Sequence, residues 1–208
     1  MDRVSLALGI AAACIHVTAY ALYNIQSKKG QSKPNAATWG IWAFLVVLNA
    51  MTYREVSHSI LVALPYYTSS ISCLLTFCYL LVTGKYDWPE WRDWVYAGLA
   101  AIGGVIWLVF HHAGYANLVI TGAILLSFEP TYKTVWRNPH KEKPGPWVLW
   151  ALAFIVITAN VAHQRRGFMA FVSPVSLCLA HYAVAMLCSR RRKENFDACR
   201  AEILPAPR

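Results

Sequence analysis

One carboxylic acid of this sequence lies inside an apolar stretch, directly before a proline. Glu129 follows Ser127 and Phe128, and Pro130 would remove a helix hydrogen bond and free a backbone carbonyl beside it. An ionisable group in a membrane interior is costly and is treated by default as functional, so Glu129 is the candidate proton-coupling residue. The alternative is a carboxylate near the helix end that reaches water or pairs with Lys133, one helical turn on.

Two histidines and two asparagines also fall within apolar stretches. An imidazole in such a place needs a hydrogen-bond partner, and His16 or His181 could find one in a polar solute or between helices. The amides of Asn49 and Asn160 can donate to and accept from hydroxyl-rich solutes, and hydrogen bonding between helices is again the alternative. All four are candidate solute-binding residues.

Two Trp-x-x-Trp pairs stand at the starts of predicted helices, Trp39 with Trp42 and Trp147 with Trp150, while Trp88, Trp91 and Trp94 show the same spacing in a loop. Flat indole faces stack on sugar rings or nucleobases, but indoles at helix ends also anchor proteins at a membrane surface. We expect anchoring for Trp39 and Trp147, and we keep both interpretations for Trp42 and Trp150.

Prolines within the apolar stretches are expected hinges, because a proline lets half of a membrane helix tilt while its neighbours satisfy the freed carbonyl. A polar run of tyrosines and serines follows the first of them, and part of this run should face the interior. The expected hinges are Pro65, Pro130 and Pro174. The full set of candidate solute-binding residues is His16, Trp42, Asn49, Tyr66, Ser70, Trp150, Asn160 and His181.

The elements that must position these residues follow from composition. Apolar residues make up 57% of the 208 residues and charged residues 14%, which is more apolar surface than a soluble domain of this length could bury. A membrane-spanning α-helix needs about 20 mainly apolar residues, and continuous apolar runs disfavour a barrel. Seven stretches qualify and predict an all-α membrane protein with seven transmembrane helices: 4–25, 39–53, 59–83, 94–111, 115–135, 147–163 and 168–189.

The net charge of +9 is gathered in short runs beside the apolar stretches, which favours a lipid bilayer over nucleic acid as the partner. Lysine and arginine are abundant in alternate loops, at 28–33, 85–92 and 137–143, and again at 190–193. Because positively charged loops stay in the cytoplasm, this pattern predicts an outside N-terminus and a cytoplasmic C-terminus. We expect a bacterial inner membrane and a disordered tail over 191–208.

The two halves of the chain share an ordered set of features. A basic loop and a proline precede each Trp-x-x-Trp pair, and a further proline follows each pair at nearly equal distance. The step along the chain from Trp42 to Pro65 is only one residue shorter than the step from Trp150 to Pro174. An odd linker helix would give both halves the same orientation, as in transporters with parallel repeats. We expect a first three-helix bundle over 1–83, a linker helix over 84–112 and a second three-helix bundle over 113–190.

The chain resembles the SWEET and PQ-loop superfamily in one segment, which reads Pro130-Thr131-Tyr132-Lys133-Thr134-Val135-Trp136-Arg137 and continues to Lys141, Lys143 and Pro144. It looks like the proline-led end of the first helix of a repeat, with its basic turn. The resemblance implies a three-plus-one-plus-three arrangement of helices. Residues 20–26 contain no Pro-Gln or Pro-Thr, so we expect a divergent bacterial-type member. Carriers of different solutes and a receptor share this fold type, so the resemblance does not choose the ligand.

No feature of the sequence favours an enzyme. It has no metal-ligand spacing, no nucleophile elbow and no phosphate-binding glycine loop, so we expect no catalytic residue, metal or cofactor. The expected function is alternating-access transport of a small polar solute, facilitated or proton-linked. The solute would be a sugar, a nucleoside or vitamin, or an amino-acid-like compound. A membrane-embedded receptor that binds without transport is the alternative, and either protein could form a homo-oligomer.

Overall fold

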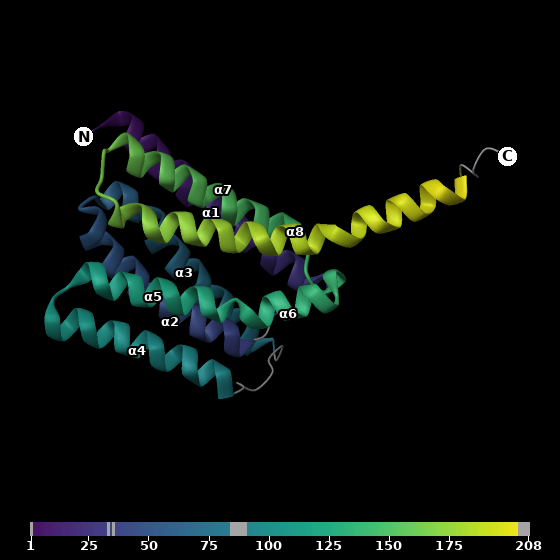
Figure 1. Cartoon of the computed structure of the whole chain (residues 1–208), viewed down its shortest axis with the longest axis horizontal. Helices are drawn as coiled ribbons and strands as arrows, with labels where there is room; N and C mark the ends of the chain where they lie inside the picture. The colour runs from purple at the N-terminus through teal and green to yellow at the C-terminus, as the bar shows by residue number, and fades with distance from the viewer. Residues whose placement is uncertain (1, 33, 35, 84–90, 204–208) are drawn as a thin grey trace.

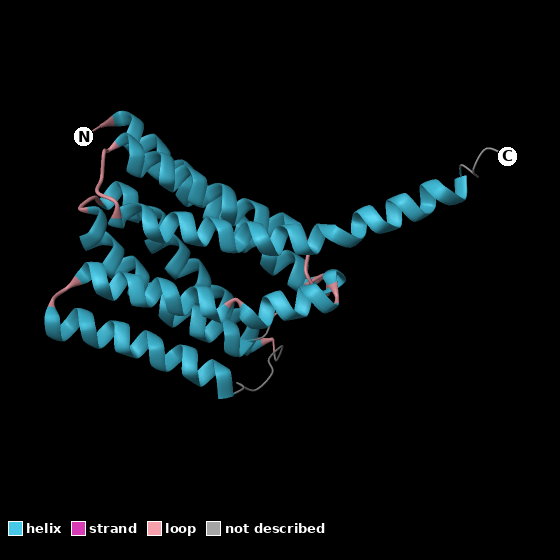
Figure 2. Cartoon of the chain, in the orientation of Figure 1, coloured by secondary structure: helices cyan, strands magenta, loops and turns pink. Residues whose placement is uncertain are grey.

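The computed structural model describes residues 2–32, 34, 36–83 and 91–203, and these ranges contain helices and loops but no strand (Figure 2). The elements in chain order are α1 (Arg3–Lys28), α2 (Ala36–Ser57), α3 (Ile60–Val82), α4 (Trp91–Phe110), α5 (Ala113–Ser127), α6 (Glu129–Arg137), the 3₁₀ turn η1 (Pro139–Lys141), α7 (Pro144–His163) and α8 (Met169–Ile203).

This order of elements fits the predicted count of seven helices, except that one predicted helix is divided into two. The predicted stretch 115–135 is split into α5 and α6, which meet at Phe128. The split follows from Pro130 in the first turn of α6, since proline has no N–H to continue the hydrogen bonds of the preceding helix. Residues 84–90, which open the predicted linker part, lie outside the described residues.

Among the described residues, four helices are long and apolar enough to cross a membrane: Arg3–Lys28, Ile60–Val82, Pro144–His163 and Met169–Arg190. Segment Trp94–Val109 of α4 is a shorter apolar helix. Large apolar side chains such as Ile71, Leu75 and Leu179 face outward from these helices. Such outer faces suit contact with lipid.

The helices pack in a recurring pattern, with α3 against both α1 and α2, and α8 against both α7 and α5. Across these groups α1 packs against α7, and α2 packs against α5. Helix α4 packs against α5 and α2 and lies at one edge of the molecule (Figure 1).

Close packing of α1 on α3 depends on Gly9. A Cβ atom at this position would lie 2.5 Å from the carbonyl oxygen of Leu61. Leu61 stands one helical turn before Pro65, so its carbonyl lacks the usual helical donor and is turned toward the glycine. Both α3 and α8 continue as helices through Pro65 and Pro174. The hinge role of these prolines stays a prediction.

Helix α8 extends beyond the last predicted span. Its backbone is helical to Ile203, where we expected a disordered tail from residue 191, and its C-terminal end projects away from the other helices (Figure 1). Residues 204–208 of the expected tail lie outside the described residues.

Candidate functional site

A small cavity of about 40 Å³ lies where α1, α2, α3, α5, α7 and α8 meet. We call it the central cavity. Its lining residues are Tyr20, Trp42, Val46, Ser69, Cys73, Ile124, Phe128, Trp150, Phe154, Leu177 and His181. The cavity therefore receives side chains from both halves of the chain.

The lining of the central cavity repeats along the sequence with one constant spacing, the step from Trp42 to Trp150, which we call the repeat step. All but one of the lining residues form pairs whose members are separated by this step. The pairs come from α1 with the α5–α6 junction, α2 with α7, and α3 with α8. They are Tyr20 with Phe128, Trp42 with Trp150, Val46 with Phe154, Ser69 with Leu177, and Cys73 with His181.

The four tryptophans of the two Trp-x-x-Trp pairs form one buried aromatic cluster. Trp39 and Trp42 lie 5.3 Å apart between ring centroids, and Trp147 and Trp150 lie 5.1 Å apart. The pairs also touch across the halves, with Trp42 and Trp147 at 6.2 Å. Only 2% of Trp39 and 1% of Trp147 are exposed, so the expectation that these two anchor the protein at a membrane surface is wrong. They pack in the interior instead.

The indole N–H groups of the two cavity tryptophans have different environments. Trp42 donates to the Ser127 hydroxyl at 2.7 Å, whereas the buried Trp150 N–H finds no acceptor among the described residues. The residue one repeat step before Ser127 is Ala19, which is completely buried and has no hydroxyl. Because the first half has alanine where the second half has serine, the buried Trp150 N–H has no acceptor among the described residues.

The two candidate histidines lie at different depths. His181 lines the central cavity, and its Nδ1 lies 2.7 Å from the Leu177 carbonyl oxygen. His16 is fully buried behind the cavity, with Nδ1 3.1 Å from the Pro65 carbonyl oxygen. A carbonyl only accepts, so each Nδ1 carries the hydrogen and each neutral ring presents Nε2 as an acceptor. That acceptor has no described partner in His16.

The candidate asparagines lie outside the central cavity and join helices. Asn160 of α7 accepts from the Ser5 hydroxyl of α1 at 2.6 Å and donates to the Ser5 carbonyl at 3.1 Å. Asn49 of α2 accepts from the Asn117 amide of α5 at 2.8 Å. Asn117, which the sequence did not single out, also donates to Thr52 at 3.0 Å.

Tyr66 and Ser70 also bond within the protein. The Tyr66 hydroxyl donates to the Ser173 hydroxyl at 3.4 Å, and Ser70 donates to the Val46 carbonyl at 2.9 Å. The serine that reaches the central cavity is the neighbouring Ser69, which lies 3.0 Å from the Tyr20 hydroxyl.

Glu129 lies at the first turn of α6 and is paired with cations. Its carboxylate accepts from Arg92 at 3.2 Å and forms an ion pair with Lys133, one helical turn away. The side chain is 32% exposed, and its pairing with Lys133 is the alternative to a proton site that the sequence left open.

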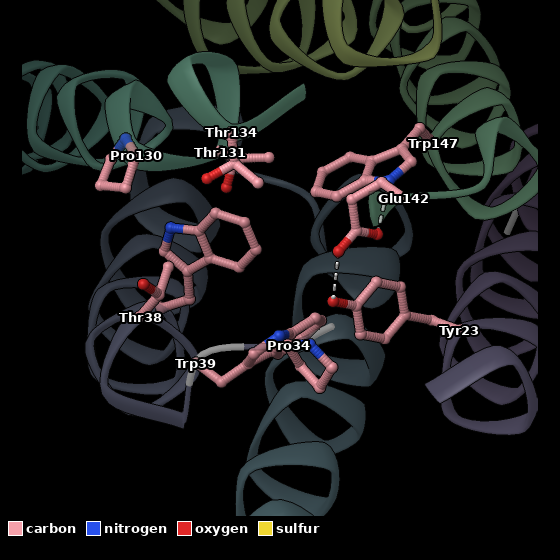
Figure 3. A pocket seen from close by; sticks show the side chains of 10 residues that line it. Tyr23, Pro34, Thr38, Trp39, Pro130, Thr131, Thr134, Glu142 and Trp147 are labelled. Carbon is pink, nitrogen blue, oxygen red and sulfur yellow. Dashed lines mark hydrogen bonds between the residues drawn. The ribbon is translucent and has the colours of Figure 1, made fainter. Parts of the chain in front are cut away.

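A second cavity, of about 90 Å³, lies beside the aromatic cluster at the ends of α1, α2, α6 and α7 (Figure 3). We call it the mouth cavity. It shares Trp42 with the central cavity, and it is lined by Tyr23, Pro34, Thr38, Trp39, Trp42, Pro130, Thr131, Thr134, Glu142 and Trp147.

Glu142 is a buried acid in the mouth cavity that the sequence did not reveal. Only 6% of it is exposed, and its carboxylate accepts from the Tyr23 hydroxyl at 3.3 Å and the Trp147 N–H at 3.4 Å (Figure 3). Burial raises its pKa to about 7, against the opposing effects of the Ser32 hydroxyl and of the Trp147 and Tyr23 donors. In the sequence, Glu142 stands between two lysines in a loop, which is typical of a solvated residue.

No group of three metal-ligating side chains occurs among the residues that the structure describes. Comparison of the chain with protein-family models, with curated proteins and with solved structures finds no match.

Proposed function

We propose that this protein is a membrane carrier for a small, uncharged, polar solute, and that it works by alternating access around the central cavity. The observation that carries the proposal is the constant repeat step between the paired residues of the cavity lining. A site built from equivalent positions of two repeats is the arrangement in which transporters hold their substrates.

The packing of the helices supports two parallel three-helix bundles. If α1 corresponds to α5 and α6, α2 to α7, and α3 to α8, every major contact among these helices has a counterpart, whereas α4 packs on α5 and α2. The contact of α1 with α3 then matches α5 with α8, and the contact of α1 with α7 matches α5 with α2. Helix α4 is the linker between the bundles. This arrangement agrees with the resemblance to the SWEET and PQ-loop superfamily, which we retain as a proposal.

The size of the central cavity favours a carrier that must open. A water molecule needs roughly 10–15 Å³ of such volume, so about 40 Å³ holds roughly three waters and excludes a sugar or nucleoside. Binding a larger solute requires the two bundles to move apart. The aromatic cluster closes the central cavity on the side that faces the mouth cavity. If the tryptophans of the cluster separated, the central cavity would open on that side.

The chemistry of the lining favours an uncharged solute. The described residues that line the central cavity include no carboxylate, lysine or arginine, while Trp150, Ser69 and His181 offer hydrogen-bonding groups. A sugar, a nucleoside or a neutral vitamin fits this set better than a zwitterion, whose charges would be desolvated without partners.

We further propose that the protein lies in a bacterial inner membrane with its N-terminus outside. The mouth cavity then faces the cytoplasm, because it lies at the ends of helices joined by the lysine-rich loops.

Uptake into proteoliposomes tests the carrier proposal. The purified protein would be screened with radiolabelled sugars, nucleosides and neutral vitamins, and we expect saturable uptake of at least one class. For that solute, Trp42→Ala and Trp150→Ala should each lower uptake about tenfold, since one stacked ring contributes about 1–3 kcal/mol. Trp94→Ala is the matched control, because Trp94 is exposed on α4. Tight binding without flux for every solute that binds would instead indicate a receptor.

A further inference from the structure

Glu142 is more deeply buried than Asp2, Glu55 and Glu129, the other acids whose side chains the structure describes. It lies between η1 and α7, yet its carboxyl group is enclosed by both halves of the protein. Tyr23 reaches it from α1 and Trp147 from α7, so one carboxyl joins the two helices that pack across the halves (Figure 3). Any opening of the mouth cavity between α1 and α7 must change the surroundings of this group.

Glu142 is also placed between two spaces. On one side it lines the mouth cavity, and on the other it lines an outer cavity of about 500 Å³ formed by the loop after α6 and by α8. The side chain is therefore buried, but it borders this outer cavity.

The described groups around the carboxyl are mainly neutral donors rather than a fixed ion-pair partner. Ion pairs within the described ranges join Arg92 and Lys133 to Glu129 and His163 to Asp2, and they do not include Glu142. Lys33, in the neighbouring loop, lies outside those ranges. The titratable and polar groups that face or flank the carboxyl are Tyr23 of α1, Ser32 of the α1–α2 loop, His140, Lys141 and Lys143 of its own loop, Trp147 of α7 and Cys188 of α8.

The acid at position 142 has no acidic counterpart at the equivalent position of the first half. The position one repeat step before Glu142 is Pro34, which lines the same mouth cavity. Of these two equivalent positions, only the one in the second half carries an acid.

The geometry points to Glu142 as the proton-binding site of the carrier: it holds a proton while the mouth cavity is closed and releases that proton to the inner water when α1 and α7 separate. This inference rests on the proposed function. It moves the coupling role from Glu129, which pairs with Arg92 and Lys133, to an acid that lies against the aromatic cluster. In this scheme the proton would come from the central cavity, whose lining shares Trp42 with the mouth cavity.

The direction of the pH effect follows from burial. The closed form raises the pKa of Glu142 from its ordinary value of 4.5 to about 7. The closed form thus binds the proton more tightly than an open form in which water reaches the carboxyl. Stabilisation of the closed form is complete below about pH 4.5, declines as the pH rises, and is lost above about pH 7.

Tryptophan fluorescence tests the proton site without a known solute, because Trp147 donates directly to the carboxylate. A titration of the purified wild-type protein in detergent should show a change in emission with its midpoint near pH 7. Glu142→Gln should abolish this transition, and Tyr23→Phe should raise its midpoint because the charged form loses a donor. Glu55→Gln is the matched control and should keep the midpoint, since Glu55 also accepts from an indole, that of Trp107, but at the surface. A transition that persists in Glu142→Gln would overturn the assignment.

Proton movement tests the coupling. Proteoliposomes loaded with a pH-sensitive dye would receive the sugars, nucleosides and neutral vitamins of the uptake screen. The transported solute should acidify the interior with the wild-type protein, and Glu142→Gln should carry labelled solute without moving protons. Solute flux without acidification by the wild type would overturn this inference and leave the carrier proposal standing. Absence of flux for every solute would overturn both.

Discussion

At the scale of single residues, the two halves differ in the hydrogen bonding of their cavity tryptophans. Trp42 and Trp150 occupy equivalent places, but only Trp42 has a serine to accept from its N–H among the described residues. A buried unpaired donor costs about 1–3 kcal/mol relative to a paired one. Because Ala19 stands where the other half has Ser127, the Trp150 N–H has a higher free energy than the Trp42 N–H in otherwise similar surroundings.

Exchanging these residues should change stability in opposite directions. Ser127→Ala leaves the Trp42 N–H unpaired and should lower the free energy of unfolding by about 1–3 kcal/mol. Ala19→Ser offers Trp150 an acceptor and should raise it by about 1 kcal/mol. Thermal unfolding of both variants in detergent is the measurement. A loss of stability in Ala19→Ser would mean that the completely buried site has no room for the hydroxyl.

At the scale of elements, small and polar residues determine how closely the helices approach. Gly9 brings α1 against the Leu61 carbonyl of α3, and the amides of Asn49, Asn117 and Asn160 join helices across the two halves. Contacts of this kind matter in membrane helices, because lipid is as apolar as the helix surfaces and small residues allow close packing.

Gly9→Ala should weaken the contact of α1 with α3. The added methyl group would lie 2.5 Å from a backbone oxygen, so the helices must separate, at a cost of about 1–3 kcal/mol in unfolding free energy. Gly122→Ala in α5 is the control, because a Cβ atom there meets nothing within 4 Å and alanine favours helix. Equal thermal stability of the two variants would contradict the close-packing argument.

The all-helical fold and the count of seven helices could be predicted from hydrophobic length. The positions of single side chains could not. Trp39 and Trp147 stand at helix ends, where indoles commonly anchor a protein at a membrane surface. Both side chains are buried instead, because each helix end packs against the other half. Glu142 is flanked by lysines in the sequence and is buried because η1 packs against α8 and the carboxyl meets Tyr23 of α1. Such long-range contacts leave no local pattern.

At the scale of the whole molecule, the proposal requires one orientation in the membrane. Reporter fusions should place the N-terminus outside and the C-terminus in the cytoplasm, because the basic loops and the mouth cavity lie on the same side. A cytoplasmic N-terminus would reverse the side to which Glu142 releases its proton. It would also contradict the predicted topology.

The paired lining of the central cavity has a further consequence for any solute held there. A site with two equivalent walls would accept an asymmetric molecule in two poses related by a half-turn, with equal occupancy. Four of the five pairs differ in residue type and would break this degeneracy, most clearly Ser69 with Leu177 and Cys73 with His181. The hydroxyl and thiol of one wall, and the alkyl group and imidazole of the other, would select one pose, so the proposed carrier would hold its solute in a single orientation.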